Sequence, residues 1–161
     1  MTVTVQPAAT VAPLRDGPHG LEVLLVQRSQ ALVFAPGAWV FPGGRVDEAD
    51  HRDGAGHAPR LAAVREAAEE AGLLLDPDAL VEVAHWTTPP GQVRRYATWF
   101  FVADANRCGG VRVDGIEAVD YRWLTPADAL AAGRAHDLTL IRPTIATLTE
   151  LLDFADVAAA L

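Results

Sequence analysis

Apolar runs separated by turn-forming residues characterise the N-terminal part of the chain. Residues 8–15 and 21–28 are apolar and β-prone, and the segment between them, 16–20, is a cluster of turn formers. This pattern predicts a β-hairpin whose second strand is largely buried. A short strand is predicted at 38–41. Residues 45–60 are predicted to form a loop, because they hold many Asp, His, Gly and Arg residues without periodicity.

The middle of the chain changes from a helical pattern to a strand pattern. Residues 61–71 are rich in Ala and contain neither Pro nor Gly, which favours a helix. Gly72 is a natural end for that helix, because Gly accepts the left-handed conformation at low cost. Strands are then predicted near 80–87, 95–103 and 119–124.

The C-terminal part predicts two more helices. Thr125 fits an N-cap and Pro126 the first position of a helix. Residues 142–154 form an amphipathic pattern, with apolar residues at Ile145, Leu148, Leu151 and Leu152. Strands, a helix, more strands and closing helices predict an α/β fold, an α/β/α sandwich around a mixed β-sheet, in one domain over residues 1–161. We expect Trp86, Trp99 and Trp123 in its core.

Composition excludes several function classes. The net charge of -8 argues against a general nucleic-acid binder, which needs clustered positive charge. The chain has no Lys, which excludes a Walker-type phosphate loop and a Lys Schiff base. Cys108 is the only cysteine, so neither an internal disulfide nor a Cys-based metal site is expected. No leader or membrane-spanning run is recognisable in the sequence, and we expect a cytoplasmic protein without membrane partners.

The helix predicted at 61–71 carries three glutamates within one turn. Glu66, Glu69 and Glu70 stand at i, i+3 and i+4, which predicts that they project from one face. Such carboxylates repel each other unless solvent, Arg or a cation compensates, and their oxygens suit hard cations such as Mg²⁺. Arg65 can pair with Glu69, four residues later. The alternative is a solvated helix face. The opposite side, expected to pack on a sheet, is formed by Val64, Ala68 and Ala71.

The context of this helix resembles the Nudix hydrolase family, whose box reads Gly-x5-Glu-x7-Arg-Glu-U-x-Glu-Glu-x-Gly-U, where U is aliphatic. The box would span residues 43–73. Two departures from it are visible: Asp50 stands in place of the first glutamate, and the spacer to Arg65 is longer by the seven residues 51–57. The matching positions are Gly44, Arg65, Glu66, Glu69, Glu70, Gly72 and Leu73.

Further segments resemble the coenzyme A and acyl-coenzyme A diphosphatase branch of this family. They lie at 24–29, 34–47, 85–89, 94–101 and 121–126. The longer spacer and the Asp are also features of that branch. The resemblance implies hydrolysis of a diphosphate linkage in a nucleotide-type small molecule, with coenzyme A or acyl-coenzyme A favoured. Alternatives are ADP-ribose, a dinucleotide or a nucleoside triphosphate as substrate, or a non-catalytic ligand sensor of the same fold.

The resemblance also implies roles for individual residues. It assigns Arg65, Glu66, Glu69 and Glu70 to the catalytic group. The three glutamates would hold Mg²⁺ or Mn²⁺ together with the main-chain carbonyl of Gly43. The general base stays open between these glutamates and another on a nearby loop.

Candidates outside the box complete the predicted site. Glu117, in a loop six residues before Trp123, has a spacing similar to that of a metal-binding glutamate in some family members; a simple loop charge is the alternative.

Arg28, Arg45 and Arg95 are candidate phosphate contacts, because a guanidinium group matches phosphate oxygens with two hydrogen bonds. For any single one, a surface salt bridge is an equal alternative. Arg94 and Arg95 would point to opposite faces of a strand, so at most one of them is expected to reach substrate. The N-terminal segment 1–5 alternates like an edge strand and could pair across a homodimer.

Overall fold

The structure is a computed structural model that describes residues 3–161. Its strands are β1 (Val5–Gly17), β2 (Gly20–Arg28), β3 (Trp39–Val40), β4 (Gly43–Arg45), β5 (Val81–Thr87), β6 (Arg95–Asp104) and β7 (Ala118–Leu124). Its helices are α1 (Ala58–Ala71), α2 (Pro126–Arg134), α3 (Arg142–Leu151) and α4 (Val157–Ala160), with short 3-10 helices η1 (Glu48–Asp53) and η2 (Pro77–Ala79).

The strands described within residues 3–161 form one seven-stranded mixed sheet. Its main path runs β3-β2-β1-β6-β5, while β4 also pairs with β1 and β7 with β2. β1 and β6 are parallel and the other pairs are antiparallel. The predicted hairpin is confirmed as β1–β2, with Leu14 opposite Val23.

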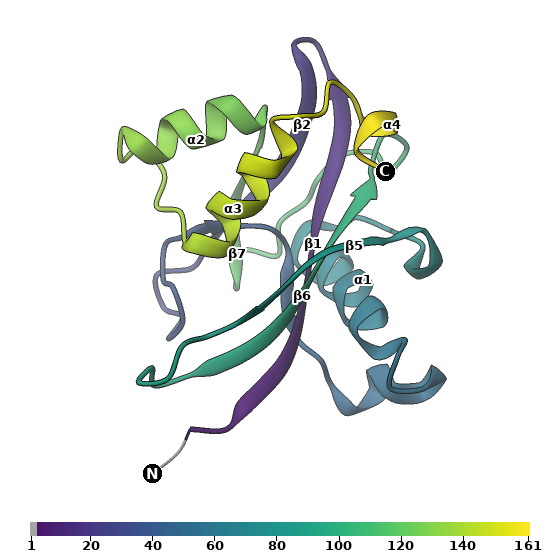
Figure 1. The fold of residues 1–161 in the computed structure, drawn as a ribbon, viewed down its shortest axis with the longest axis vertical. Helices are drawn as coiled ribbons and strands as arrows, with labels where there is room; N and C mark the ends of the chain where they lie inside the picture. Colours follow the sequence, from purple (N-terminus) through teal and green to yellow (C-terminus); the bar gives the residue numbers. More distant parts are fainter. Residues whose placement is uncertain (1–2) are drawn as a thin grey trace.

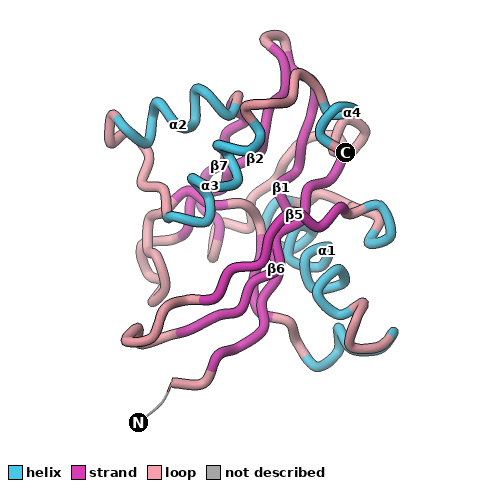
Figure 2. Tube along the Cα trace, in the orientation of Figure 1, coloured by secondary structure: helices cyan, strands magenta, loops and turns pink. Residues whose placement is uncertain are grey.

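Helices cover both faces of this sheet (Figures 1 and 2). On one face, α1 packs its Ala62, Ala63 and Ala67 against a cluster that includes Ala9 of β1 and Phe101 of β6. On the other face, α2 and α3 close a second apolar cluster. Its members include Leu14, Leu25, Trp39, Phe100, Val102, Leu130, Leu148 and Leu151. The predicted α/β class, with a mixed sheet between helical layers, is confirmed.

The predicted loop at 45–60 is wrong in part. Gly43–Arg45 is a strand because it pairs with β1, where Thr10 lies opposite Gly43, a contact distant in sequence. Glu48–Asp53 forms η1, which begins with reciprocal hydrogen bonds between Asp47 and Asp50. Helix α1 begins at Ala58, earlier than predicted, and ends at Ala71, followed by Gly72, whose φ of 69° gives the predicted left-handed cap.

The buried face of α3 differs from the apolar pattern of its sequence. Leu148 and Leu151 lie in the core as predicted. Ile145 is 40% exposed, however, and Leu152 lies beyond the last helical residue and is 48% exposed. Thr144 is buried in place of Ile145. The orientation of α3 on the sheet therefore buries Thr144 and exposes Ile145.

The prediction that Trp86, Trp99 and Trp123 lie in the core is wrong for Trp86, whereas Trp99 and Trp123 pack against two core clusters. Trp86 is 37% exposed, and the other two are only partly buried. Trp99 stacks edge-on with His85 of the neighbouring strand. Trp39 is the tryptophan in the core cluster, at 4% exposure. Trp86 lies on β5, which ends the main path of the sheet and has little cover.

Two predictions concern the N-terminus and membranes. Met1 and Thr2 of the predicted edge strand lie outside the described residues, Val3 and Thr4 are not in a strand, and Val5 begins β1. The homodimer stays a prediction. Among the helices of residues 3–161, none is both long and apolar enough to cross a bilayer.

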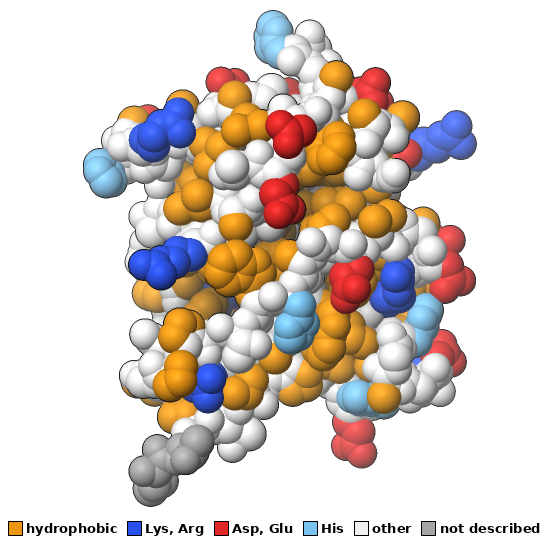
Figure 3. All heavy atoms as spheres, viewed as in Figure 1, with side chains coloured by type: hydrophobic (Ala, Val, Ile, Leu, Met, Phe, Trp, Pro, Cys, Tyr) orange, Lys and Arg blue, Asp and Glu red, His pale blue; other side chains and the backbone are white. Residues whose placement is uncertain are grey.

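Charged side chains are dispersed over the face drawn in Figure 3. Blue arginine side chains lie apart from one another on this face, between orange apolar and red acidic ones. A nucleic-acid backbone is bound by a continuous row of positive charge, which this face does not present. The predicted absence of a nucleic-acid partner stays a prediction.

Candidate metal centre

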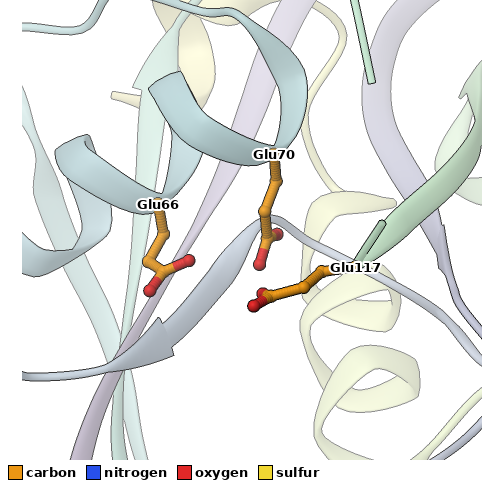
Figure 4. A group of neighbouring side chains, drawn as sticks. All are labelled: Glu66, Glu70 and Glu117. Atoms are coloured by element: carbon orange, nitrogen blue, oxygen red, sulfur yellow. The ribbon is translucent and has the colours of Figure 1, made fainter. Parts of the chain in front are cut away.

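Three glutamate side chains converge at the C-terminal half of α1. Glu66 and Glu70 come from α1, and Glu117 comes from the loop before β7 (Figure 4). Each offers a carboxylate oxygen, and these oxygens lie within 4.8 Å of one another. Glu66 and Glu70 are 8% and 5% exposed, whereas Glu117 is exposed. We call these three residues the carboxylate triad.

Helical geometry explains why Glu66 and Glu70 converge and Glu69 does not. Residues four apart lie nearly above one another on a helix, whereas Glu69 is turned about 60° away from Glu66 and about 100° from Glu70. The Glu69 side chain is 58% exposed and contacts Arg65 at 3.4 Å. Glu69 is therefore not among the converging carboxylates, and its roles in catalysis and metal binding stay predictions.

The predicted buried side of α1 is also shifted by one residue along the helix. Ala71 is buried as expected, but Val64 and Ala68 are only partly buried. Ala63 and Ala67 are fully buried instead. The buried side of α1 therefore extends toward the glutamates. It places Glu66 and Glu70 between the helix and β4 rather than in solvent.

Gly43 and Gly44 of β4 make room for this arrangement. A Cβ at Gly43 would lie 2.6 Å from the carbonyl oxygen of Ala9 in β1. A Cβ at Gly44 would lie 2.5 Å from the carboxylate oxygen Oε1 of Glu66. Strand β4 can therefore lie between β1 and the triad only because Gly43 and Gly44 have no side chains. The N–H of Gly43 donates to Oε2 of Glu70 at 3.3 Å, while metal binding by the Gly43 carbonyl stays a prediction.

Burial and mutual repulsion make the ionised form of the Glu66 and Glu70 carboxylates unfavourable. Burial, and then the charge of Glu66, raise the pKa of Glu70 to about 9. Burial also raises the pKa of Glu66 above its usual value, although Arg65 opposes that change. Buried carboxylates become protonated or bind a cation, because an unpaired buried charge is costly. Three oxygen ligands at this spacing fit a hard divalent cation.

Arg65 connects the triad to a second group of acidic side chains. Its guanidinium lies 2.9 Å from Glu66, 3.0 Å from Asp50 and 3.3 Å from Asp47. It also donates to the carbonyl of Arg45 at 3.0 Å. The hydrogen bond to Asp50 is the main reason that the pKa of Arg65 is raised. Sequence reasoning expected only the contact with Glu69 and missed Asp47.

Asp50 occupies the position that the family box gives to a glutamate. It is 1% exposed and accepts a hydrogen bond from the N–H of Asp47 at 2.8 Å. Burial alone would raise the pKa of Asp50. The hydrogen bonds from Arg65 and Asp47 outweigh it and bring that pKa below the usual value. The extra residues 51–57 lie between Asp50 and α1, and Arg65 nevertheless contacts Asp50 at 3.0 Å.

The three arginines predicted to contact substrate lie in different surroundings. Arg28 ends β2 opposite Ala118, next to Glu117, and donates to the carbonyl of Phe34 at 2.9 Å. Arg45 is exposed, and its side chain donates to Gln6. Arg95 donates to the carbonyl of Thr88 at 3.0 Å in the turn between β5 and β6. The backbones of Arg28 and Arg45 both adjoin the triad, next to Glu117 and Gly44 respectively, and all three roles stay predictions.

The sequence model of the NUDIX domain family matches residues 4–143, which contain the triad and Arg65. The chain belongs to the NUDIX family. The match covers most of the predicted single domain, whose extent to residue 161 stays a prediction.

Curated relatives within the NUDIX family act on coenzyme A compounds. An acyl-coenzyme A diphosphatase of Homo sapiens is 26% identical over 249 residues, covering 95% of this chain and 66% of the relative. A peroxisomal coenzyme A diphosphatase of Caenorhabditis elegans is 44% identical over 66 residues, covering 41% and 26% of the two chains. This chain thus spans less than two thirds of the length of these relatives. The predicted cytoplasmic location stays a prediction, since one relative is peroxisomal.

Solved structures of NUDIX proteins share the fold. The crystal structure of a NUDIX hydrolase from Alicyclobacillus acidocaldarius has a TM-score of 0.89 and 27% identity, covering 98% of this chain and 96% of that one. A C. elegans Ap4A hydrolase binary complex gives 0.64 at 22% identity, covering 92% and 96%. The NUDIX domain of Shewanella oneidensis NrtR with ADP ribose gives 0.72 at 16% identity, covering 93% and 88%. The last two show the fold alone. Family and relatives together support a hydrolase.

Proposed function

We propose that this NUDIX protein is a hydrolase that depends on Mg²⁺ or Mn²⁺ and cleaves a diphosphate linkage in a nucleotide-type small molecule. The convergence of Glu66, Glu70 and Glu117 within 4.8 Å carries the proposal. A solvated helix face, the alternative reading of the sequence, would leave Glu66 and Glu70 exposed, but both are buried. Membership in the NUDIX family adds the reaction class.

The triad would hold the metal, with the Gly43 carbonyl and Glu69 as further predicted ligands. A bound divalent cation would neutralise phosphate oxygens and increase the acidity of water. The chain supplies the positions of the ligands. Glu66 is fixed from one side by Arg65 at 2.9 Å and Glu70 by the Gly43 N–H at 3.3 Å. Ligands already held in place lose little freedom when a metal binds.

Hydrolysis requires a proton acceptor beside the attacked phosphorus. The water oxygen forms a bond to one phosphorus, and the bond from that phosphorus to the bridging oxygen breaks. The bridging oxygen leaves with the electron pair on the other phosphate. The water proton passes to a carboxylate of this chain. Glu66, Glu69, Glu70 and Glu117 remain the candidates for this general base, and Arg65 would hold Glu66 and Glu69 in place.

Coenzyme A or acyl-coenzyme A is the favoured substrate class. The human relative, an acyl-coenzyme A diphosphatase, aligns over 95% of this chain, and the C. elegans coenzyme A diphosphatase is 44% identical over its shorter match. Arg28 would contact a phosphate from its place beside Glu117, and Arg45 and Arg95 are further candidates. The alternative is ADP-ribose, a dinucleotide or a nucleoside triphosphate, because surrounding loops select the substrate within one fold.

A substrate panel tests this proposal. Purified protein with Mg²⁺ or Mn²⁺ is incubated separately with coenzyme A, acetyl-coenzyme A, ADP-ribose, Ap4A, NADH and nucleoside triphosphates, and products are identified by mass. Coenzyme A cleavage yields 3',5'-ADP and a phosphopantetheine. Turnover of ADP-ribose alone would displace coenzyme A. Binding without turnover of any member would favour the ligand sensor and contradict an enzyme.

A further inference from the structure

The loop that carries Glu117 is closed by a single carboxylate, that of Asp114. Its Oδ1 accepts hydrogen bonds from the backbone N–H groups of Ile116 at 3.0 Å, Glu117 at 3.1 Å and Ala118 at 2.9 Å. The N–H of Gly115 donates to the carbonyl of Ala118 at 2.8 Å. Asp and Gly commonly form such turns, because the Asp side chain satisfies the backbone donors that follow it. One oxygen atom of Asp114 therefore accepts three of the hydrogen bonds that hold residues 114–118.

This turn is also bonded to both elements that flank the triad. The N–H of Asp114 donates to the carbonyl of Glu70 at 3.2 Å, near the end of α1. The N–H of Ser29, just after β2, donates to the carbonyl of Glu117 at 2.9 Å. Asp114 is thus joined through the main chain to Glu70 and through its side chain to the backbone of Glu117. Two members of the triad are set relative to one another by this residue.

We propose that Asp114 is a positioning residue that holds the Glu117 carboxylate toward Glu66 and Glu70 and thereby increases the affinity of the triad for a divalent metal. The inference rests on the proposed metal-dependent function. Glu117 is the exposed member of the triad and comes from a loop, so it has the most freedom to lose when a ligand binds (Figure 4). Asp114 itself is not among the converging carboxylates.

Two substitutions separate position from charge. D114N removes the negative charge but keeps an Oδ1 atom that accepts the same three hydrogen bonds. D114A removes both. We expect D114N to bind Mn²⁺ within about twofold of the unmodified protein and D114A to bind it about tenfold more weakly, the scale of a lost outer-shell partner. Calorimetry with Mn²⁺ alone gives both dissociation constants without any substrate.

A matched control lies in another exposed turn. Oδ1 of Asp76 accepts a hydrogen bond from the N–H of Asp78 at 2.9 Å at the start of η2. D76A removes the same charge and the same kind of turn acceptor, and it should leave Mn²⁺ affinity unchanged. Equal losses in D114A and D114N would assign the effect to charge and overturn the proposal. A lower melting temperature in D114A with unchanged Mn²⁺ affinity would also overturn it.

Amide hydrogen exchange of the unmodified, metal-free protein tests whether the turn is fixed, and this test does not depend on whether a variant folds. The N–H groups of Ile116, Glu117 and Ala118 should exchange more slowly than those of Gly109 and Gly110, which lie in a loop without comparable bonds among the described contacts. Exchange at unstructured rates would contradict a fixed turn. If the unmodified protein bound no Mn²⁺, the proposed function would fall together with this inference. If the unmodified protein bound Mn²⁺ but D114A left that binding intact, or D114A and D114N weakened it equally, the inference alone would fall.

Discussion

Two groups of acidic side chains lie close together in this molecule: Asp47 and Asp50, and the carboxylate triad. Their buried carboxylates differ in the direction in which the pKa is changed. Asp47 and Asp50 are bound by Arg65, at 3.3 and 3.0 Å. Because Asp50 has this partner, its pKa is lowered even though the residue is buried. In the triad the balance is reversed, and burial raises the pKa of Glu70 to about 9.

Glu66 belongs to both groups. It contacts Arg65 at 2.9 Å and also faces Glu70 and Glu117. One guanidinium shared among several carboxylates compensates the buried charge of Asp50 in the first group and leaves the second with excess negative charge. The same residue types thus form a structural ion pair where the protein supplies the cation, and a candidate ligand site where it does not.

Removing a triad carboxylate should have the largest effect on activity. E70Q keeps the size of the side chain and the hydrogen bond from the Gly43 N–H, but it cannot ligate a metal as a carboxylate. We expect turnover to fall by at least about 100-fold, since even outer-shell partners of a metal are worth 10–100-fold. Steady-state kinetics in Mg²⁺ measures this loss.

E69Q is the matched comparison for E70Q. Glu69 is the neighbouring box glutamate, but it lies outside the triad and its side chain is 58% exposed. We therefore expect a smaller loss than in E70Q, through the weakened contact with Arg65. Losses of equal size would show that the triad is not the distinguishing feature of the site.

Breaking the first group should mainly affect stability. In R65A the carboxylate of Asp50, 1% exposed, loses its partner. The free energy of unfolding should decrease by about 2–3 kcal/mol, less than the roughly 3–5 kcal/mol of a fully buried pair because Arg65 is partly exposed. Urea denaturation measures it, with D78A, whose exposed carboxylate pairs with His57, as a control that should lose less than about 1 kcal/mol. Similar losses in both variants would contradict a special role for the Asp50 contact.

The sequence predicts these two groups unequally, for reasons visible in particular residues. Local rules correctly predicted the cap at Gly72 and the N-cap at Thr125, because both depend on backbone conformation close in sequence. Glu117 is selected for a different reason, namely that its spacing from Trp123 resembles that of a metal-binding glutamate in some family members. The helical pattern could not show that Glu66 and Glu70 are buried and Glu69 is exposed, because this depends on how α1 meets β4. Nor did it reveal Asp47, whose contact with Arg65 requires the η1 turn.

Strand β4 offers a way to disturb the triad without touching a carboxylate. In G44A the new Cβ would lie 2.5 Å from Oε1 of Glu66, a contact that the side chain can relieve only by moving. We expect Mn²⁺ affinity to fall about tenfold, as for other changes that misplace a ligand. G56A is the control, because nothing lies within 4 Å of its Cβ. Unchanged affinity in G44A would mean that the position of Glu66 is not critical.

The pH dependence of stability should have opposite signs in the two groups. Glu70 has a folded-state pKa of about 9, above its usual 4.5, so the folded protein binds more protons than the unfolded chain between these values. Its contribution to the stability of the metal-free protein is therefore full below pH 4.5 and is lost as pH rises toward 9. The pKa of Asp50 is lowered, so its contribution is present above about pH 4 and is lost as pH falls through the folded-state pKa.

Urea denaturation of the metal-free protein between pH 5 and pH 9 isolates the Glu70 contribution. Stability should decrease with rising pH in the unmodified protein, and E70Q should flatten this slope because glutamine does not titrate. Saturating Mn²⁺ should reduce or reverse the slope, since a cation that binds the ionised triad makes deprotonation favourable in the folded state. D50N should leave the slope above pH 5 unchanged. A slope that is identical in E70Q and the unmodified protein would show that the excess negative charge of the triad is already neutralised without a metal, and the contrast between the two groups would disappear.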